Sequence, residues 1–406
     1  MSLLDRRTFM KVAAGVGLAL QSRPLPALTG VRQKLRGVLW LWMDGGMCPA
    51  HTWDPKPDSL RGCRVKAIPT TVPGIQVSEL LPICATQMKH LTIIRSLSHG
   101  FGDLDMATKV MHVGDMTAAT TDLPPIGTIL AHELGPKEFP LPKYVSIGGP
   151  PVPERTGFGH DCLPFRVNGS NPSNPIPNLR RYVDSMRDRE RAKLLFDQNQ
   201  EWGARRLQPE VERLESAHVQ SEAMMNTPLL KAFDVQEEPA ALRAEYGEGF
   251  GQQCLMARRL VQAGCPFVEI GTEGWRPMSC HCEAYRQRVK ILDQGLGTLV
   301  KDLAQKELLA ETLVVCASPF GRLMRPLGGD SSHAFSVVLA GGCLPGGMAY
   351  GDTGPNGNGC TSPVRVKNLF ATILSICGID WDKEYRTESL KKKTYASGGW
   401  PIEELF

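Results

Sequence analysis

An unbroken apolar run, Val38 to Met43, ends abruptly at Asp44-Gly45-Gly46. A continuous run of β-branched and aromatic residues bounded by a glycine turn predicts a strand buried on both faces, as in a parallel sheet. Ligands bind outside the carboxyl ends of the strands in such sheets, so the Asp44 carboxylate is well placed for function. Taken alone, however, the stretch favours the simpler role of a turn cap for Asp44.

Further apolar runs of strand length alternate with segments of helical spacing. Strands are predicted at 91–97, 144–147, 266–270, 313–316 and 335–339, and helices at 75–90, 104–113, 251–263, 284–306 and 366–377. This alternation predicts a three-layer α/β domain, in which helices cover both faces of a mostly parallel central sheet. We expect one such domain over residues 31–406.

Two stretches depart from the alternation. Residues 157–177 are rich in Gly, Asn and Pro, which predicts a surface excursion. Residues 178–226 are dense in Arg, Glu and Asp with sparse apolar positions, which predicts a charged, solvated helical insertion within the domain.

The N-terminus carries a targeting pattern. Arg6-Arg7, within Asp5 to Lys11, precedes the short apolar run Val12 to Leu20. Paired arginines before a weakly hydrophobic segment are typical of a twin-arginine export signal, so residues 1–30 are set apart from the fold. The alternative is an amphipathic first helix that contains two arginines. The export signal predicts a periplasmic or extracellular protein.

Composition excludes several classes. The 406 residues are 42% hydrophobic, as in an ordinary globular chain, and the formal net charge is only +4. No basic block with interleaved aromatic residues occurs, so nucleic-acid binding is not indicated. No apolar run reaches the length of a transmembrane helix. The twelve cysteines include no C-x-x-C pair, and the sequence does not pair them into disulfides.

Acidic and imidazole side chains recur in the loops that follow several predicted strands. They are Asp44, His51 and Asp54; His99, Asp103 and Asp105; His281 between Cys280 and Cys282; and Asp330 and His333. Because Asp, His and Cys can all bind zinc, this recurrence suggests a divalent metal site. Nine histidines also fall in loops by chance, and a single one is more often a hydrogen-bonded surface residue.

The chain resembles a family of exported bacterial proteins classed as a domain of unknown function, itself a distant relative of the sulfatase and alkaline phosphatase superfamily. The resemblance runs nearly end to end and rests on several short motifs. They are His51 to Pro57, Val72 to Ile75, Arg95 to His99, Phe250 to Gln253, Ala257 to Val261, Phe320 to Arg322, Leu339 to Gly342 and Pro401 to Phe406.

The superfamily resemblance implies a hydrolase of phosphate or sulfate esters that uses one or two metals. Carried over by position, it implies Asp44, His281, Asp330 and His333 as ligands of zinc, calcium or manganese. Arg322 would then bind the anion of a small ester substrate.

Several positions depart from the superfamily pattern. Ser279 stands where an Asp is usual before His281, and Pro319 replaces a usual Glu. Leu104 and Asp105 occupy the place of the nucleophile, where leucine cannot attack and an aspartate repels an anion.

The sequence therefore leaves two main functions. The first is a sulfatase-like protein with a degraded active site, which binds a component of the cell envelope or supports its structure. The second is a metal-dependent ester hydrolase that uses metal-bound water. A thiol-based zinc site at Cys280-His281-Cys282 is a weaker third, because adjacent ligands cannot easily face one ion.

Overall fold

The computed structural model describes most of the chain after the predicted export signal. The described residues are 35–57, 65–114, 123–150, 152, 158–171, 175–177, 185–203, 208–276, 282–323, 329–357, 359–360, 362–386, 392–394, 396 and 398–406. The export signal predicted at 1–30 and the candidate ligand His281 lie outside these residues.

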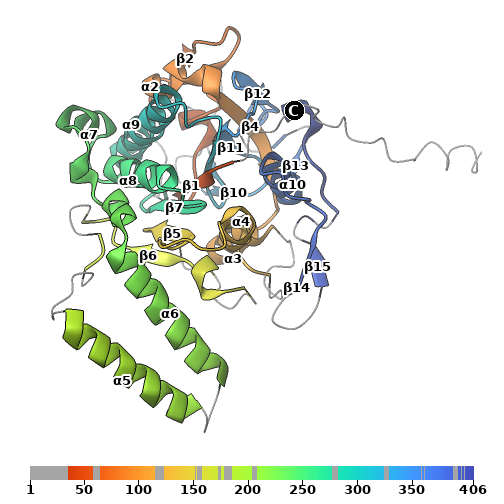
Figure 1. Ribbon diagram of the computed structural model, residues 1–406. Helices are drawn as coiled ribbons and strands as arrows, with labels where there is room; N and C mark the ends of the chain where they lie inside the picture. Colours follow the sequence, from red (N-terminus) through yellow and green to blue (C-terminus); the bar gives the residue numbers. More distant parts are fainter. Residues whose placement is uncertain are drawn as a thin grey trace, which may run out of the picture. The chain divides into compact units, whose positions relative to one another are not determined.

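A central sheet of nine described strands organises the domain (Figure 1). Its order is β12-β4-β11-β8-β1-β7-β5-β6, and β13 also pairs with β4. The strands are β1 (Gly37–Met43), β4 (Leu91–Ser98), β5 (Tyr144–Ile147), β6 (Phe165–Val167), β7 (Phe267–Thr272), β8 (Thr312–Ala317), β11 (Phe335–Gly341), β12 (Met348–Tyr350) and β13 (Val364–Arg365). Every residue of β1 is buried, as its continuous apolar pattern predicts.

Strand direction decides which loops meet. β1 is parallel to β7 and β8, and β7 is parallel to β5. β11 is antiparallel to both β4 and β8, so β4 runs in the same direction as β8. The carboxyl ends of β1, β4, β5, β7 and β8 therefore share one edge of the sheet with the start of β11. The predicted mostly parallel sheet is confirmed.

Helices cover both faces of this sheet (Figure 1). Leu39, Leu41 and Met43 share one core cluster with residues of α2 (Pro82–Thr86), α8 (Phe250–Gln262) and α9 (Glu283–Gln305). Trp40 and Trp42 share the other with residues of α3 (Leu104–Val113), α4 (Ile126–Leu134) and α10 (Val366–Ile376). The alternation of β1 side chains between two cores confirms the three-layer α/β prediction.

Short elements complete the fold. They are the ribbons β2 (Ala67–Pro69) with β3 (Gln76–Ser78), β9 (Gly321–Arg322) with β10 (Asp330–Ser331) and β14 (Glu384–Arg386) with β15 (Lys392–Thr394); α7 (Ala240–Tyr246); and the 3₁₀ turns η1 (Pro49–His51), η2 (Met88–His90), η4 (His160–Cys162), η5 (Pro228–Phe233), η6 (Val235–Glu237) and η7 (Glu403–Leu405).

Two local predictions are corrected. The segment 75–90 is not one helix, because it forms β3, the five-residue α2 and η2. Pro82 starts α2 at its first turn, where a missing amide hydrogen costs nothing. The excursion 157–177 also contributes a strand, β6, to the end of the sheet.

The charged insertion forms two helices, α5 (Ser185–Gly203) and α6 (Gln208–Asn226), of which α6 contacts η4 and η5. Their described residues include large exposed apolar side chains, among them Phe196 at 53% and Leu214 at 57% exposure. The charge pattern of the sequence did not predict this apolar surface.

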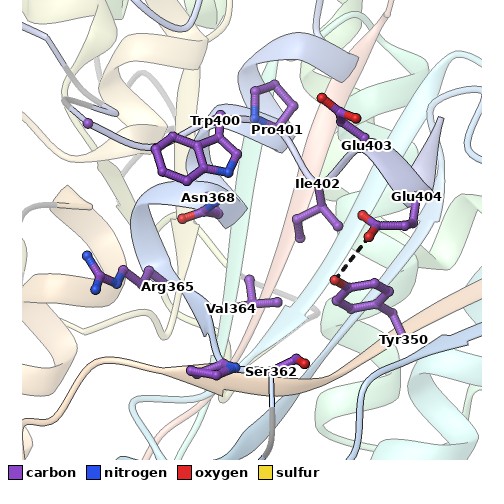
Figure 2. Close-up of a pocket in the computed structure, with 12 residues that line it drawn as sticks. Tyr350, Ser362, Val364, Arg365, Asn368, Trp400, Pro401, Ile402, Glu403 and Glu404 are labelled. Carbon is purple, nitrogen blue, oxygen red and sulfur yellow. Dashed lines mark hydrogen bonds between the residues drawn. The ribbon is translucent and has the colours of Figure 1, made fainter. Parts of the chain in front are cut away.

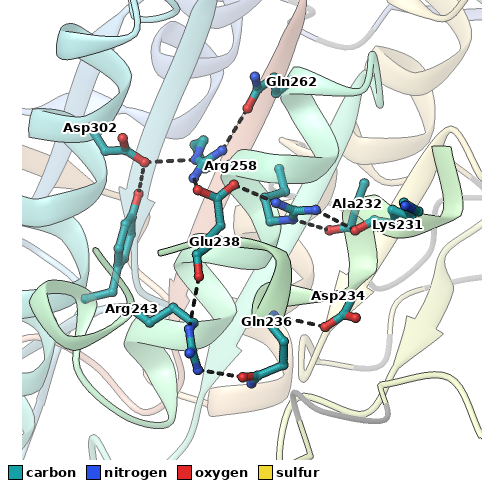
Figure 3. A network of polar contacts seen from close by, with 11 residues as sticks. Lys231, Ala232, Asp234, Gln236, Glu238, Arg243, Arg258, Gln262 and Asp302 are labelled. Carbon is teal, nitrogen blue, oxygen red and sulfur yellow. Dashed lines mark hydrogen bonds and ion pairs between the residues drawn. The ribbon is translucent and has the colours of Figure 1, made fainter. Parts of the chain in front are cut away.

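A buried ionic network joins α8 to α9 and to the segment before α7 (Figure 3). The Arg258 guanidinium lies 3.0 Å from a Glu238 oxygen and 2.8 Å from an Asp302 oxygen, and the Tyr246 hydroxyl donates to Asp302. Burial alone would lower the pKa of Arg258, but Glu238 and Asp302 raise it overall. Paired in this way, a guanidinium is tolerated inside the protein.

Candidate functional site

The turn that follows β1 packs closely against the loop that follows β7. The Asp44 amide donates to the Thr272 carbonyl (3.0 Å), and the Trp275 amide donates to the Asp44 carbonyl (3.2 Å). Gly45 has φ of 106°, and a Cβ there would lie 2.7 Å from the Arg276 Cβ. Only glycine suits this backbone conformation and this approach.

The same turn is bound on its other side to the loop that follows β8. The Met47 amide donates to the Ser318 hydroxyl (3.3 Å), and the Arg322 amide donates to the Met47 carbonyl (3.1 Å). Ser318 in turn donates to the Phe320 carbonyl (2.9 Å). The loops after β1, β7 and β8 are thus held together by hydrogen bonds. We call this surface, defined by Asp44, Arg276, Arg322 and Asp330, the β1 edge.

Asp44 is half-buried at the end of the central strand. Burial raises the pKa of its carboxyl, and the nearby Glu273 carboxylate raises it further. The nearby Trp42 indole and the charges of His112 and Arg276 oppose this rise. Asp44 therefore stands near both negative and positive groups, as a functional carboxylate at a strand end would.

Asp330 is held between two arginines. Its Oδ1 contacts the Arg322 guanidinium, which is 4% exposed, across the β9–β10 ribbon. Its Oδ2 lies 2.8 Å from Nη2 of Arg276, which belongs to the loop after β7. Arg322, predicted to bind a substrate anion, therefore binds an anion of the protein itself. Arg276 links Asp330 to the vicinity of Asp44.

His333, three positions after Asp330, lies near His99. It is exposed, and its charge, together with the larger effect of burial, lowers the pKa of His99. Nε2 of His99 donates to the Pro319 carbonyl (2.6 Å), while its Nδ1 accepts from the Phe101 amide (3.0 Å). These bonds describe a neutral, structural imidazole.

The four predicted metal ligands are thus distributed as follows. Asp44 and Asp330 both lie near Arg276, His333 lies near His99, and His281 lies outside the described residues. Among the residues that the structure describes, no three His, Cys, Asp or Glu side chains are placed to hold a metal ion. The predicted metal site stays a prediction, because His281 is one of its members.

Residues of the motif His51 to Pro57 make contacts inside the protein. His51, Trp53 and Asp54 are at most 4% exposed. Asp54 accepts from the Thr353 amide and hydroxyl, and it pairs with Lys56 and Arg95. The polar residues of this motif therefore anchor the segment after β1 to β4 and to the segment that contains Thr353.

Glu269 belongs to a network that the sequence did not reveal. It lies in the middle of β7 with no exposed surface, and its Oε1 is 2.8 Å from Nε2 of His112. The Tyr144 hydroxyl donates to its other oxygen (2.8 Å). A charged residue inside an apolar strand was the available signal, since such a group requires buried partners.

The start of α3 lies where the superfamily pattern places a nucleophile. Leu104 is its first residue, and the Asp103 side chain caps the helix by accepting from the Met106 amide (3.0 Å). The negative charges of Asp103 and Asp105 disfavour a bound anion at this helix end.

Two buried cysteines and the helices of the described chain add two observations. Cys254 and Cys316 are buried among apolar side chains, where a thiol behaves as a small hydrophobic group. Among the described residues, no helix has the length and apolar character needed to span a bilayer.

Comparisons with solved structures return sulfatases and alkaline phosphatases. PsFucS1 sulfatase from Pseudoalteromonas sp. is 13% identical, with a TM-score of 0.38, over 93% of this chain and 72% of that one. The protein Ps i-CgsB is 13% identical, with a TM-score of 0.41, over 86% and 72%. A mutant of TAB5 alkaline phosphatase with Mg bound is 11% identical, with a TM-score of 0.38, over 86% and 99%.

No curated protein matches the sequence. A family model, in contrast, matches almost the whole described domain, from residue 36 to residue 406. The chain belongs to the family described as "Protein of unknown function (DUF1501)".

Proposed function

We propose that this protein is an exported, sulfatase-like protein that binds a component of the cell envelope or supports its structure, and that it does not hydrolyse esters. The twin-arginine pattern at Arg6-Arg7 supports the envelope location. The proposal rests chiefly on the contacts of a single residue, Asp330.

Both Asp330 oxygens face guanidinium groups, from Arg322 and Arg276. A divalent cation at this carboxylate would lie within about 5 Å of two positive charges, where the Coulomb repulsion is several kcal/mol at a protein-like dielectric constant. The two existing ion pairs would also have to break. The donor set therefore fits an internal ion-pair cluster better than a metal centre.

The second candidate function is metal-dependent hydrolysis of phosphate or sulfate esters. Asp44 favours it, because this half-buried carboxylate lies beside Glu273 at the carboxyl end of the central strand. In this function His281 and His333 would complete the ligand set. Arg322 would have to exchange Asp330 for the substrate anion.

Metal content separates the two functions. The full chain, purified without chelator, is analysed for zinc, manganese, calcium and iron, and tested for hydrolysis of p-nitrophenyl phosphate and p-nitrophenyl sulfate. We expect less than about one metal ion per ten chains and no hydrolysis above a buffer blank. Metal at about 100 times the Kd of a specific site would raise the free energy of unfolding by ~2.7 kcal/mol. We expect no such rise when metal is added to this protein.

Stoichiometric metal would overturn the proposal if it disappears in the His281→Ala variant and persists in His132→Ala. His132 lies on α4, against Phe158, and serves as the matched control.

A further inference from the structure

A pocket of about 500 Å³ lies along the outer side of β4, and none of the four candidate metal ligands lines it. It is formed by β12, β13, the start of α10 and the C-terminal segment. Tyr350 of β12 pairs with Ile94, and Arg365 of β13 pairs with Ser98. Its volume is in the range of small-ligand sites. We call it the Trp400 pocket.

Trp400 is unusual in this pocket because it is 64% exposed. A large aromatic side chain left in water forgoes the stabilisation of burial, so a free-standing indole face is a candidate contact surface. Figure 2 shows the indole above Asn368 on one side of the pocket, with Glu404 and Tyr350 on the other. Buried Val364 and Ile402 are also among the lining residues.

The segment that carries Trp400 is fixed to α10. A Cβ at Gly399 would lie 2.7 to 2.8 Å from atoms of Lys367, so backbone and helix are in direct contact there. On the other side of Trp400, the Ile402 amide donates to the Thr372 hydroxyl (2.9 Å). The exposed indole therefore stands on a backbone that is positioned before any ligand arrives, which lowers the entropy cost of binding.

The polar groups around the indole include donors and acceptors. Asn368 offers both, Arg365 donates, and the Glu403 and Glu404 carboxylates accept. Among the residues drawn in Figure 2, one hydrogen bond joins two of these groups, from the Tyr350 hydroxyl to Glu404 (3.4 Å). Two carboxylates against one guanidinium disfavour an anionic ligand, whereas a simple cation would make no use of the Arg365 and Asn368 donors.

We propose that the Trp400 pocket binds a neutral saccharide, one ring of which stacks on the Trp400 indole while its hydroxyls bond to Asn368 and Glu404. Sugar hydroxyls donate and accept at once, which matches the mixed groups of the pocket. None of these residues belongs to the β1 edge, so the inference does not depend on the contacts of Asp330.

The test is isothermal titration calorimetry of the full chain with cellohexaose, maltohexaose, laminarihexaose and chitohexaose. At least one should bind with a Kd between about 10 µM and 1 mM. Trp400→Ala should weaken that binding about tenfold or more, and Trp400→Phe, which keeps an aromatic face, about threefold or less. Glu404→Gln should weaken it about threefold to tenfold, through loss of a charged acceptor.

Ile291→Ala is the matched control, because Ile291 is an exposed apolar residue (39%) on α9 that does not line the pocket. The Ile291→Ala variant should bind the saccharide with the same affinity as the wild type. Binding of none of the four hexasaccharides would overturn the proposal, and so would equal binding by Trp400→Ala. Preferential binding of a sulfated hexasaccharide or of tetramethylammonium would overturn it as well.

Discussion

The β1 edge and the Trp400 pocket are two polar regions of one domain, and their side chains differ in burial and in pairing. At the β1 edge, Asp330 and Arg322 are paired and largely buried. At the Trp400 pocket, the indole is 64% exposed and stands among exposed polar groups. Because a buried charge is tolerated only with partners, pairing at the first surface stabilises the fold, whereas groups at the second remain available to a ligand.

Replacing a buried or an exposed tryptophan by alanine should give the largest difference in the free energy of unfolding. Trp53, in the segment after β1, has no exposed surface, whereas Trp400 is 64% exposed. We expect Trp53→Ala to lower the free energy of unfolding by about 4 kcal/mol through lost burial and the cavity left behind, and Trp400→Ala by less than about 1 kcal/mol. Urea denaturation followed by circular dichroism measures both. Similar losses in the two variants would contradict the contrast.

Replacing the buried arginine of the β1 edge should likewise cost more stability than replacing the exposed one. The Arg322 side chain is 5% exposed and that of Arg276 is 49% exposed, although both contact Asp330. Arg322→Ala should cost about 3 kcal/mol because it leaves Asp330 with one exposed partner, and Arg276→Ala less than about 1 kcal/mol. The same denaturation experiment decides, and a larger loss for Arg276→Ala would show that the exposed pair is the structural one.

Asp54 should make the stability of the segment after β1 depend on pH. Burial alone would raise the pKa of its carboxyl, but Arg95, Thr353 and Lys56 lower it overall from the ordinary 3.8. A lowered pKa stabilises the fold above the unfolded pKa, and that contribution is lost as the pH falls through the folded pKa. Asp54→Asn should therefore cost about 2 kcal/mol at pH 7, and the difference from wild type should shrink below about pH 4.

Asp161→Asn is the control for this pH series. Its pKa is also lowered, by Lys143 against the opposing effect of burial, but its side chain is 40% exposed. The loss at pH 7 should stay below about 1 kcal/mol because solvent screens this pair. A pH-independent effect of Asp54→Asn would show that its hydrogen bonds matter and its charge does not.

Gly399 tests whether the position of Trp400 matters separately from its presence. A methyl group there would press against the backbone of Lys367, so Gly399→Ala should displace the indole without removing it. We expect saccharide affinity to fall about threefold to tenfold with a modest loss of stability. Gly378→Asn, at a positive φ that asparagine tolerates and outside the pocket, is the control and should bind as the wild type does. Unchanged binding by Gly399→Ala would contradict a fixed platform.

Local sequence signals predicted the elements that depend on local physics. The run Val38 to Met43 became a strand buried on both faces, as its apolar pattern predicted. The segment 75–90 was predicted wrongly, because apolar spacing there reflects three short elements that pack on the same core. The spacing of apolar residues shows which side of a segment faces the core. Over only a few residues it does not distinguish a helix from another short element.

Pairing between distant residues was beyond the sequence. Arg276, in the loop after β7, pairs with Asp330, which lies 54 positions further along the chain. The buried Glu269 required His112 and Tyr144, from two other elements, to explain it. In each case the chemistry of one side chain was visible, and its partner was set by which loops or strands the sheet order brings together.

By itself, the sequence determined the class of the domain, its central strand and the position of Asp44 at the end of that strand, because these follow from apolar periodicity and from glycine at a turn. Only the tertiary structure decided that Asp330 lies between two arginines and that Trp400 stands exposed over a pocket. Both outcomes depend on segments more than fifty residues apart along the chain, such as Arg276 and Asp330 or Tyr350 and Glu404. Such contacts form only when packing has placed their elements side by side.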